Sequence, residues 1–144
     1  MRRRARQNST MFDFGDGNGP VPAHRHADGG GWVADTAFVD ASLIFEDALV
    51  FGNAKVYSSD LYDKVRVWGN ATVTDALLKD VVQVYGDAVL TGTGGEDGFV
   101  IVDGDSVIHG RAVLGPGVYD NVEMDGVTTK PTLGAFLGKY WKKT

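Results

Sequence analysis

Residues 50–55 read Val-Phe-Gly-Asn-Ala-Lys, residues 67–72 read Val-Trp-Gly-Asn-Ala-Thr, and residues 84–89 read Val-Tyr-Gly-Asp-Ala-Val. Each stretch begins 17 residues after the one before it, and a looser copy, Gly-Asp-Ser at 104–106, follows the third after 18 residues. Counting back by 17 from the first stretch reaches Val33. A fixed period that keeps the same residues indicates a repeat architecture, in which each repeat forms one structural unit.

Aliphatic residues recur at three places in each repeat. The columns are Val33, Val50, Val67, Val84 and Val102; then Val39, Val56, Val73, Leu90 and Ile108; then Ile44, Leu61 and Leu78. Residues that recur once per coil stack on their equivalents about 4.8 Å away, so the columns would fill one continuous interior. Gly-Asn and Gly-Asp suit the corners, where positive φ is often needed. The sequence therefore predicts an all-β solenoid of about five coils over residues 33–119.

The six-residue stretches resemble the hexapeptide repeat, in which an aliphatic residue, often followed by Gly, precedes a small residue at the fifth position. The resemblance implies a left-handed parallel β-helix of triangular cross-section that assembles as a homotrimer. Its handedness departs from the usual right-handed crossover preference and is taken from the resemblance alone. One departure from the family pattern is the period of 17 rather than 18, which predicts a corner shortened by one residue.

The segments outside the regular coils have their own predicted roles. Residues 1–11 form a basic, disordered tail, with Met11 as an alternative first residue, and residues 12–32 form an irregular partial coil that caps the first edge. The Gly-rich stretch 92–98 is predicted to be a surface loop that replaces a strand of the fourth coil.

The C-terminal segment, residues 120–144, is predicted to contain an amphipathic α-helix over 132–143. Its apolar residues follow the i, i+3, i+4, i+7, i+8 pattern of a helix with one buried face. They are Leu133, Phe136, Leu137, Tyr140 and Trp141. The helix is expected to pack on a coil face of its own or a neighbouring subunit; a membrane-surface helix is the alternative.

The charge distribution is uneven. All 19 acidic residues lie between Asp13 and Asp125, whereas eight of the 14 basic residues lie outside that stretch. An acidic body favours a protein partner and makes nucleic acid an unexpected one. The chain has no cysteine, no apolar run of bilayer length and no signal-peptide pattern, so it predicts a cytoplasmic protein without disulfides or a membrane span.

Large residues beside the first aliphatic column are predicted to point outward and to form a subunit interface. An exposed aromatic column is too apolar to face water without a partner. The predicted interface residues are Leu49, Phe51, Trp68, Tyr85, Ile101, Phe136, Tyr140 and Trp141. A platform on which an aromatic ligand or a sugar stacks is the alternative interpretation of the same column.

Histidines are the candidate catalytic residues, because family acyltransferases use a histidine as general base at a cleft between subunits. His109 follows the inward Ile108 and should point outward, so it is the first candidate; His24 and His26 come next. The family's γ-class carbonic anhydrases bind zinc through three histidines, but His109 lies too far from His24 and His26 along the solenoid, so no metal site is predicted.

Two functions follow from these features. The first is a non-catalytic homotrimeric β-helix that binds a protein or serves as a structural module and needs no cofactor; residues 21–35 look like the start of small hexapeptide proteins of bacteria and their viruses, for which scaffolding, virion decoration or inhibition of a host protein are the expected roles. The alternative is an acyltransferase that uses acetyl-CoA, with His109 as base. The small number of basic residues in the body disfavours a site for the phosphates of coenzyme A.

Overall fold

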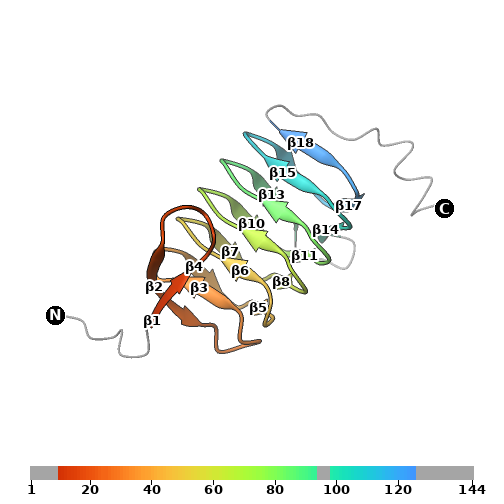
Figure 1. The fold of residues 1–144 in the computed structure, drawn as a ribbon. Coiled ribbons are helices and arrows are strands. Elements are labelled where there is room, and N and C mark those ends of the chain that lie inside the picture. The colour runs from red at the N-terminus through yellow and green to blue at the C-terminus, as the bar shows by residue number, and fades with distance from the viewer. Residues whose placement is uncertain (1–9, 94–97, 126–144) are drawn as a thin grey trace.

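The protein is a parallel β-solenoid in a computed structural model that describes residues 10–93 and 98–125. Figure 1 shows its coils stacked one on the next, from β1 at one end to β18 at the other. The strands are β1 (Thr10–Asp13), β2 (Pro20–Arg25), β3 (Trp32–Ala34), β4 (Phe38–Asp40), β5 (Leu43–Ile44), β6 (Leu49–Val50), β7 (Lys55–Tyr57), β8 (Asp60–Leu61), β9 (Arg66–Val67), β10 (Thr72–Thr74), β11 (Ala76–Leu78), β12 (Gln83–Val84), β13 (Val89–Thr91), β14 (Val100–Asp103), β15 (Val107–His109), β16 (Val113–Leu114), β17 (Gly117–Asp120) and β18 (Glu123–Asp125).

Three sheets run along the solenoid, and each coil contributes one short strand to each of them. The first sheet has the order β1-β2-β3-β6-β9-β12-β15-β18, the second β4-β7-β10-β13-β16, and the third β5-β8-β11-β14-β17. From β3 onward all neighbouring strands are parallel. The described part therefore holds five coils of three strands, followed by β18, as the period of the sequence predicts.

The core is built from one column of inward side chains from each sheet, together with buried corner residues such as Ala54, Val65 and Ala71. All of the column residues are buried except Val39, which is half-buried. The columns are Val33, Val50, Val67, Val84, Ile108 and Met124 in the first sheet; Val39, Val56, Val73, Leu90 and Leu114 in the second; and Ile44, Leu61, Leu78, Val102 and Tyr119 in the third. Burial of each aliphatic side chain contributes roughly 1.5–3 kcal/mol, so stacking of coils is the main source of stability.

The predicted register is wrong after the fourth coil. Val84 pairs with Ile108, not with Val102, because Val102 pairs with Leu78 in the third sheet. The cause is the junction between β13 and β14, where residues 92–99 stand in the place that one residue occupies between β10 and β11. The predicted loop is therefore an insertion at a corner and replaces no strand.

The Gly-Asp-Ser stretch at 104–106 resembles the Gly-Asn-Ala and Gly-Asp-Ala corners in sequence, but it lies at a different corner of the coil. Gly104 lies where the third sheet leads into the first, and its N–H donates to the Oδ2 of Asp80 at 2.9 Å. The true equivalent of Gly86 is Gly110, whose nitrogen would lie 2.8 Å from a Cβ added at Gly86. The fourth Gly-X-Ala corner thus lies at residues 110–112.

Side chains at two corners bond to the backbone of the next coil. Ser42 Oγ accepts the N–H of Ser59 at 3.0 Å, and Ser59 Oγ accepts the N–H of Ala76 at 3.0 Å. Asp63 Oδ2 likewise accepts the N–H of Asp80 at 3.2 Å. These bonds satisfy backbone N–H groups at the corners, where a short turn does not supply a local acceptor for every N–H.

The N-terminal segment covers the first edge as an antiparallel hairpin, not as the predicted partial coil. Strands β1 and β2 pair with each other, and β2 pairs with β3. The linker that follows covers the edge of the third sheet, where Ile44 donates its N–H to Asp28 O and accepts from the N–H of Gly31. A free strand edge invites association, so these bonds protect this end. The predicted helix over 132–143 lies outside the described residues.

Candidate functional site

Five aromatic rings form a ladder along the outer side of the first sheet, which we call the aromatic face. The ring centroids lie 4.7 Å apart from Phe14 to Phe51, 5.4 Å from Phe51 to Trp68, 4.3 Å from Trp68 to Tyr85, and 5.0 Å from Tyr85 to His109. The four interplanar angles are 15°, 1°, 12° and 15°. Nearly parallel rings at these distances have the offset-stacked geometry that aromatic pairs favour.

The ladder follows from the repeat, except for its first ring. Phe51, Trp68, Tyr85 and His109 each come directly after an inward residue of the first sheet, so they point outward at the same place in successive coils. In the preceding coil Ala34 occupies this place. Because alanine leaves the place empty, Phe14 enters from the segment after β1 and stacks on Phe51. Sequence reasoning missed Phe14; the small residue at 34 was the available signal.

The N-terminal segment covers only the first part of the aromatic face. Phe14 and Phe51 are each 2% exposed, and Phe12 stacks on Trp32 at 4.4 Å and 16°. Trp68, Tyr85 and His109 remain half-buried. Rings lie on both sides of Trp68 and Tyr85, so a flat ligand cannot stack fully on either without displacing a neighbour. The open part of the face thus presents mainly ring edges.

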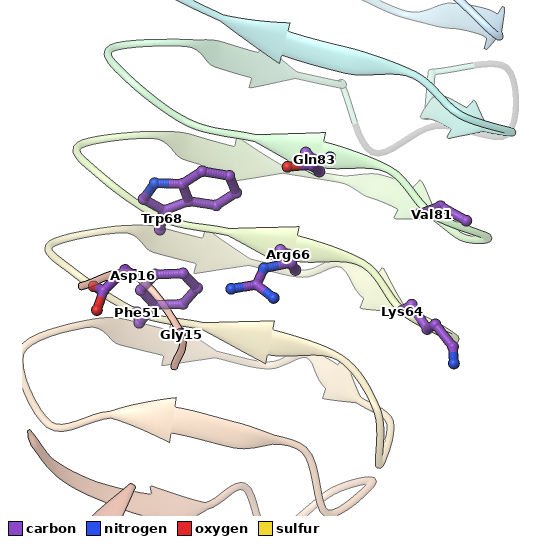
Figure 2. Close-up of a pocket in the computed structure, with 8 residues that line it drawn as sticks. All are labelled: Gly15, Asp16, Phe51, Lys64, Arg66, Trp68, Val81 and Gln83. Carbon is purple, nitrogen blue, oxygen red and sulfur yellow. The ribbon is translucent and has the colours of Figure 1, made fainter. Parts of the chain in front are cut away.

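A hollow of about 480 Å³ lies beside the ladder, between Gly15 and Asp16 of the N-terminal segment and the rings of Phe51 and Trp68 (Figure 2). Its lining residues are Gly15, Asp16, Phe51, Lys64, Arg66, Trp68, Val81 and Gln83. Arg66 donates from Nη2 to the carbonyl oxygen of Phe14, and its guanidinium carbon lies 5.5 Å from the Phe51 ring centre and 5.9 Å from that of Trp68. The Arg66 side chain therefore fixes the N-terminal segment against the ladder.

Asp16 contributes the one carboxylate in this hollow. The backbone N–H of Asn18 lowers the pKa of Asp16, and the positive charge of Arg66 lowers it further. Asp16 is exposed and also accepts from Asn18 Nδ2 at 3.1 Å. At neutral pH the hollow therefore holds two cations and one anion.

A second hollow lies beside the stacked rings of Phe12 and Trp32. It is lined by Phe12, Arg25, Trp32, Glu46, Asp47 and Leu49. Its cation is already engaged within the chain, since the Arg25 guanidinium carbon stands 4.7 Å above the Trp32 ring centre and Nη1 donates to Gly30 O at 2.9 Å. In this hollow the guanidinium of Arg25 already has partners within the chain, and the other two charged groups are the carboxylates of Glu46 and Asp47.

The three histidines all make contacts within the chain, and the structure does not bring them together. His109 points outward as predicted; its Nε2 lies 3.2 Å from Glu123 Oε2 and its ring ends the described ladder. His24 Nδ1 lies 2.7 Å from Asp35 Oδ1, and His26 Nε2 lies 2.8 Å from Ser42 O. Among residues 10–93 and 98–125, no three histidine or carboxylate side chains are grouped to hold a metal ion.

The predicted interface residues fall on two different sheets. Leu49, Phe51, Trp68 and Tyr85 share the aromatic face, whereas Ile101 belongs to β14 and points outward from the third sheet. There it follows Leu77 in register and precedes Val118. The register error explains the separation. Phe136, Tyr140 and Trp141 lie outside the described residues.

Asp103 forms a carboxyl pair with Asp120 at the edge of the third sheet, where the two residues are in register. Burial, together with the hydrogen bond and the charge of Asp120, raises the pKa of Asp103 to about 6, against the opposing charge of Lys79. Asp103 Oδ1 is buried without a protein donor among the described residues. The pair therefore favours binding of a proton.

No family model matches this chain, and neither the curated proteins nor the solved structures contain a match. The resemblance to the hexapeptide repeat therefore rests on the residues quoted from the sequence, and the parallel solenoid rests on the strand pairing. No helix in the described part of the chain has the length and apolar character needed to cross a bilayer.

Proposed function

We propose that this chain is a non-catalytic binding module, built as a left-handed β-helix of the hexapeptide type, that assembles as a homotrimer and binds another protein through its aromatic face. The observation that carries the proposal is the half-covered ladder. Trp68, Tyr85 and His109 remain partly exposed on a rigid sheet beside a charged hollow. Aromatic side chains held in one orientation contribute contact area to an interface at little entropic cost.

The position of His109 supports a binding role. Its ring stacks on Tyr85, and its Nε2 faces the Glu123 carboxylate, so the residue has a structural reason to be present. In the register of the first sheet, the next residue beyond His109 is Asp125, and Arg66 lies two coils away. Coenzyme A phosphates near this histidine would meet the carboxylates of Glu123 and Asp125, and Arg111, in the corner that follows His109, is a single positive charge against these two.

The third sheet offers the surface that we propose for trimer formation. Its outward column is apolar in four of five coils and only half-buried: Leu43, Leu77, Ile101 and Val118, interrupted by Asp60. Multi-angle light scattering of the wild-type chain should give three times the 15.4 kDa of one chain. Leu77→Glu should reduce the mass to that of a monomer, whereas Val113→Glu, at a 60% exposed position on the second sheet, should leave it unchanged. A monomeric wild type would contradict the trimer.

The binding role is tested by capturing a partner and mapping its contact. Val107 points outward on the aromatic face beside His109, so Val107→Glu should abolish capture of the wild-type partner, while Val113→Glu retains it. Circular dichroism checks that both variants fold. Capture that both variants keep, or that both lose, would show that the aromatic face is not the contact.

Acyl transfer is the second candidate, favoured by the pairing of His109 with Glu123, because a carboxylate can orient an imidazole as a general base. Thermal unfolding with acetyl-CoA, with and without His109→Ala, decides between the two functions. A ligand that binds only the folded state raises the melting temperature. We expect no rise for either protein; a saturable rise that His109→Ala abolishes would establish the acyltransferase.

A further inference from the structure

We propose that the hollow beside Trp68 binds a compact anion attached to an apolar group, such as a phosphorylated aromatic side chain or a carboxylate next to an aromatic ring. The inference rests on the proposed function, because it states which chemistry the aromatic face would recognise on a partner. It is carried by the placement of Lys64, Arg66 and Val81 around one opening (Figure 2).

The hollow carries a local positive charge, whereas residues 13–125 as a whole are acidic. Six basic residues accompany 19 acidic ones between residues 13 and 125, yet two of the six, Lys64 and Arg66, line this hollow. Lys64 lies in the turn before β9 and Arg66 is the first residue of β9, and both side chains line the same hollow. A paired cationic spot in an acidic surface attracts anions to one place while the surroundings repel them.

The Arg66 guanidinium is held in place before a ligand arrives. Its Nη2 donates to Phe14 O, and its plane lies near Phe51 and Trp68. A guanidinium carries five N–H donors in a rigid fork, so one bond to a carbonyl leaves donors for a carboxylate or phosphate. Lys64 is exposed and can move to complete the contact. The anion would thus meet one fixed and one mobile cation.

The remainder of the hollow suits an apolar group. Val81 is a 47% exposed aliphatic residue, and the half-buried Trp68 presents an edge to the same space. Gln83 adds an amide that can donate or accept a hydrogen bond. The volume of about 480 Å³ lies within the range of small-ligand sites. A ring of phenyl size can therefore contact Val81 while its anion faces Lys64 and Arg66.

Asp16 limits the affinity. Its exposed carboxylate lies in the hollow and interacts with Arg66, so it competes with an incoming anion for the same guanidinium. Asn18 holds Asp16 through its backbone N–H and its amide, at 3.0 Å and 3.1 Å. Replacement by the isosteric asparagine would remove the charge. Asp16→Asn should therefore strengthen binding, which a merely unfolded variant cannot do.

The test is a titration of the full chain with phenyl phosphate and with phenylacetate, followed by NMR chemical shifts of the Trp68 indole. We expect saturable shifts with at least one probe, and the stronger probe identifies phosphate or carboxylate as the anion. Benzyl alcohol and inorganic phosphate, which each lack one half of the ligand, should bind more weakly. Lys64→Gln should weaken binding by about threefold, as expected for one exposed charge pair.

Two further variants complete the design. Lys55→Gln removes an exposed lysine from β7 in the second sheet and should leave the affinity unchanged, whereas Asp16→Asn should raise it about threefold. Equal affinities in Lys64→Gln, Lys55→Gln and wild type, or no saturation with either probe, would overturn this site. Capture of a partner that Val107→Glu abolishes would still support the aromatic face, so the two proposals fail separately.

Discussion

Replacing Gly69 with alanine measures how closely neighbouring coils approach. Gly69 has φ of +72°, and a Cβ there would lie 2.9 Å from the backbone nitrogen of Gly86 in the next coil. Gly19, in the turn between β1 and β2, has φ of +71° but no atom within 4 Å of the same added Cβ. Gly19→Ala therefore repeats the backbone strain of Gly69→Ala without the contact between coils.

The two substitutions should differ in the free energy of unfolding. A left-handed conformation costs an alanine roughly 1–2 kcal/mol, and both variants bear that cost. Forcing an extra methyl group into packed backbone costs typically 1–3 kcal/mol more, and a backbone nitrogen cannot turn aside as a flexible side chain can. We therefore expect losses of about 1 kcal/mol for Gly19→Ala and about 3 kcal/mol for Gly69→Ala.

Urea unfolding followed by tryptophan fluorescence gives both values, provided that the dependence on urea is the same for all three proteins. The difference between the variants isolates the contact between coils, because their φ angles match. Equal losses of stability in the two variants would refute the close approach of Gly69 to Gly86, and with it the stacking of corners on which the solenoid rests.

Three other perturbations test particular parts of the structure. Deleting residues 93–99 should leave Gly92 in the place of Asp75 and restore a period of 17 between the coils of Val84 and Ile108. The product should be folded by circular dichroism, with a melting temperature at least equal to that of wild type; an unfolded product would mean that the segment forms part of a coil. Asp103→Asn should be about 1 kcal/mol more stable than wild type at pH 7, with solvent screening reducing the effect, and should lose this advantage at pH 4. Burial and the neighbouring Asp120 raise the Asp103 pKa from 3.8 to about 6, so the contribution of Asp103 to wild-type stability is highest below pH 4 and is lost as the pH rises through 6; an equal difference in melting temperature at both pH values would contradict this. Phe14→Ala should cost about 3 kcal/mol in urea unfolding, as for a large buried aromatic residue; a loss below 1 kcal/mol would show that the N-terminal segment does not stabilise the ladder.

The solenoid could be predicted from the sequence because its determinants are periodic. An aliphatic residue, an aromatic residue and a Gly-Asn or Gly-Asp corner return every 17 residues, and each requires its own equivalent in the next coil. The second and third core columns, through Leu90 and Leu78, follow from the same period. The short corner is also correct, since the inward residues Val56 and Leu61 are five residues apart, whereas Val50 and Val56 are six residues apart.

The errors arose where the period is interrupted. Left-handed residues occur at all three corners of a coil among the described residues. Gly104 lies at the corner where Asp80 lies one coil earlier, so the Gly-Asp-Ser stretch was mistaken for the corner that contains Gly86. Consequently Asp103, not His109, seemed to follow Tyr85. Phe14 could not be found by any period, because it fills a place that Ala34 leaves empty.

The candidate site was only partly predictable for the same reason. The aromatic residues from Phe51 to Tyr85 follow the repeat, and their shared face was therefore expected. The hollow depends on a contact across 52 residues, between Arg66 and Phe14 O, that no local pattern reveals. Lys64 and Arg66 line a common hollow because Gly15 and Asp16 of the N-terminal segment lie beside them.

The most direct test of the account is a nuclear Overhauser spectrum of the aromatic ring protons, because both proposals depend on a ladder that runs unbroken from Phe14 to His109. The account predicts cross-peaks between the Tyr85 and His109 rings, whose centroids lie 5.0 Å apart. It equally predicts cross-peaks between Phe14 and Phe51, at 4.7 Å. Cross-peaks from Tyr85 to the side chain of Asp103, with none to His109, would place Val102 after Val84 and contradict the account.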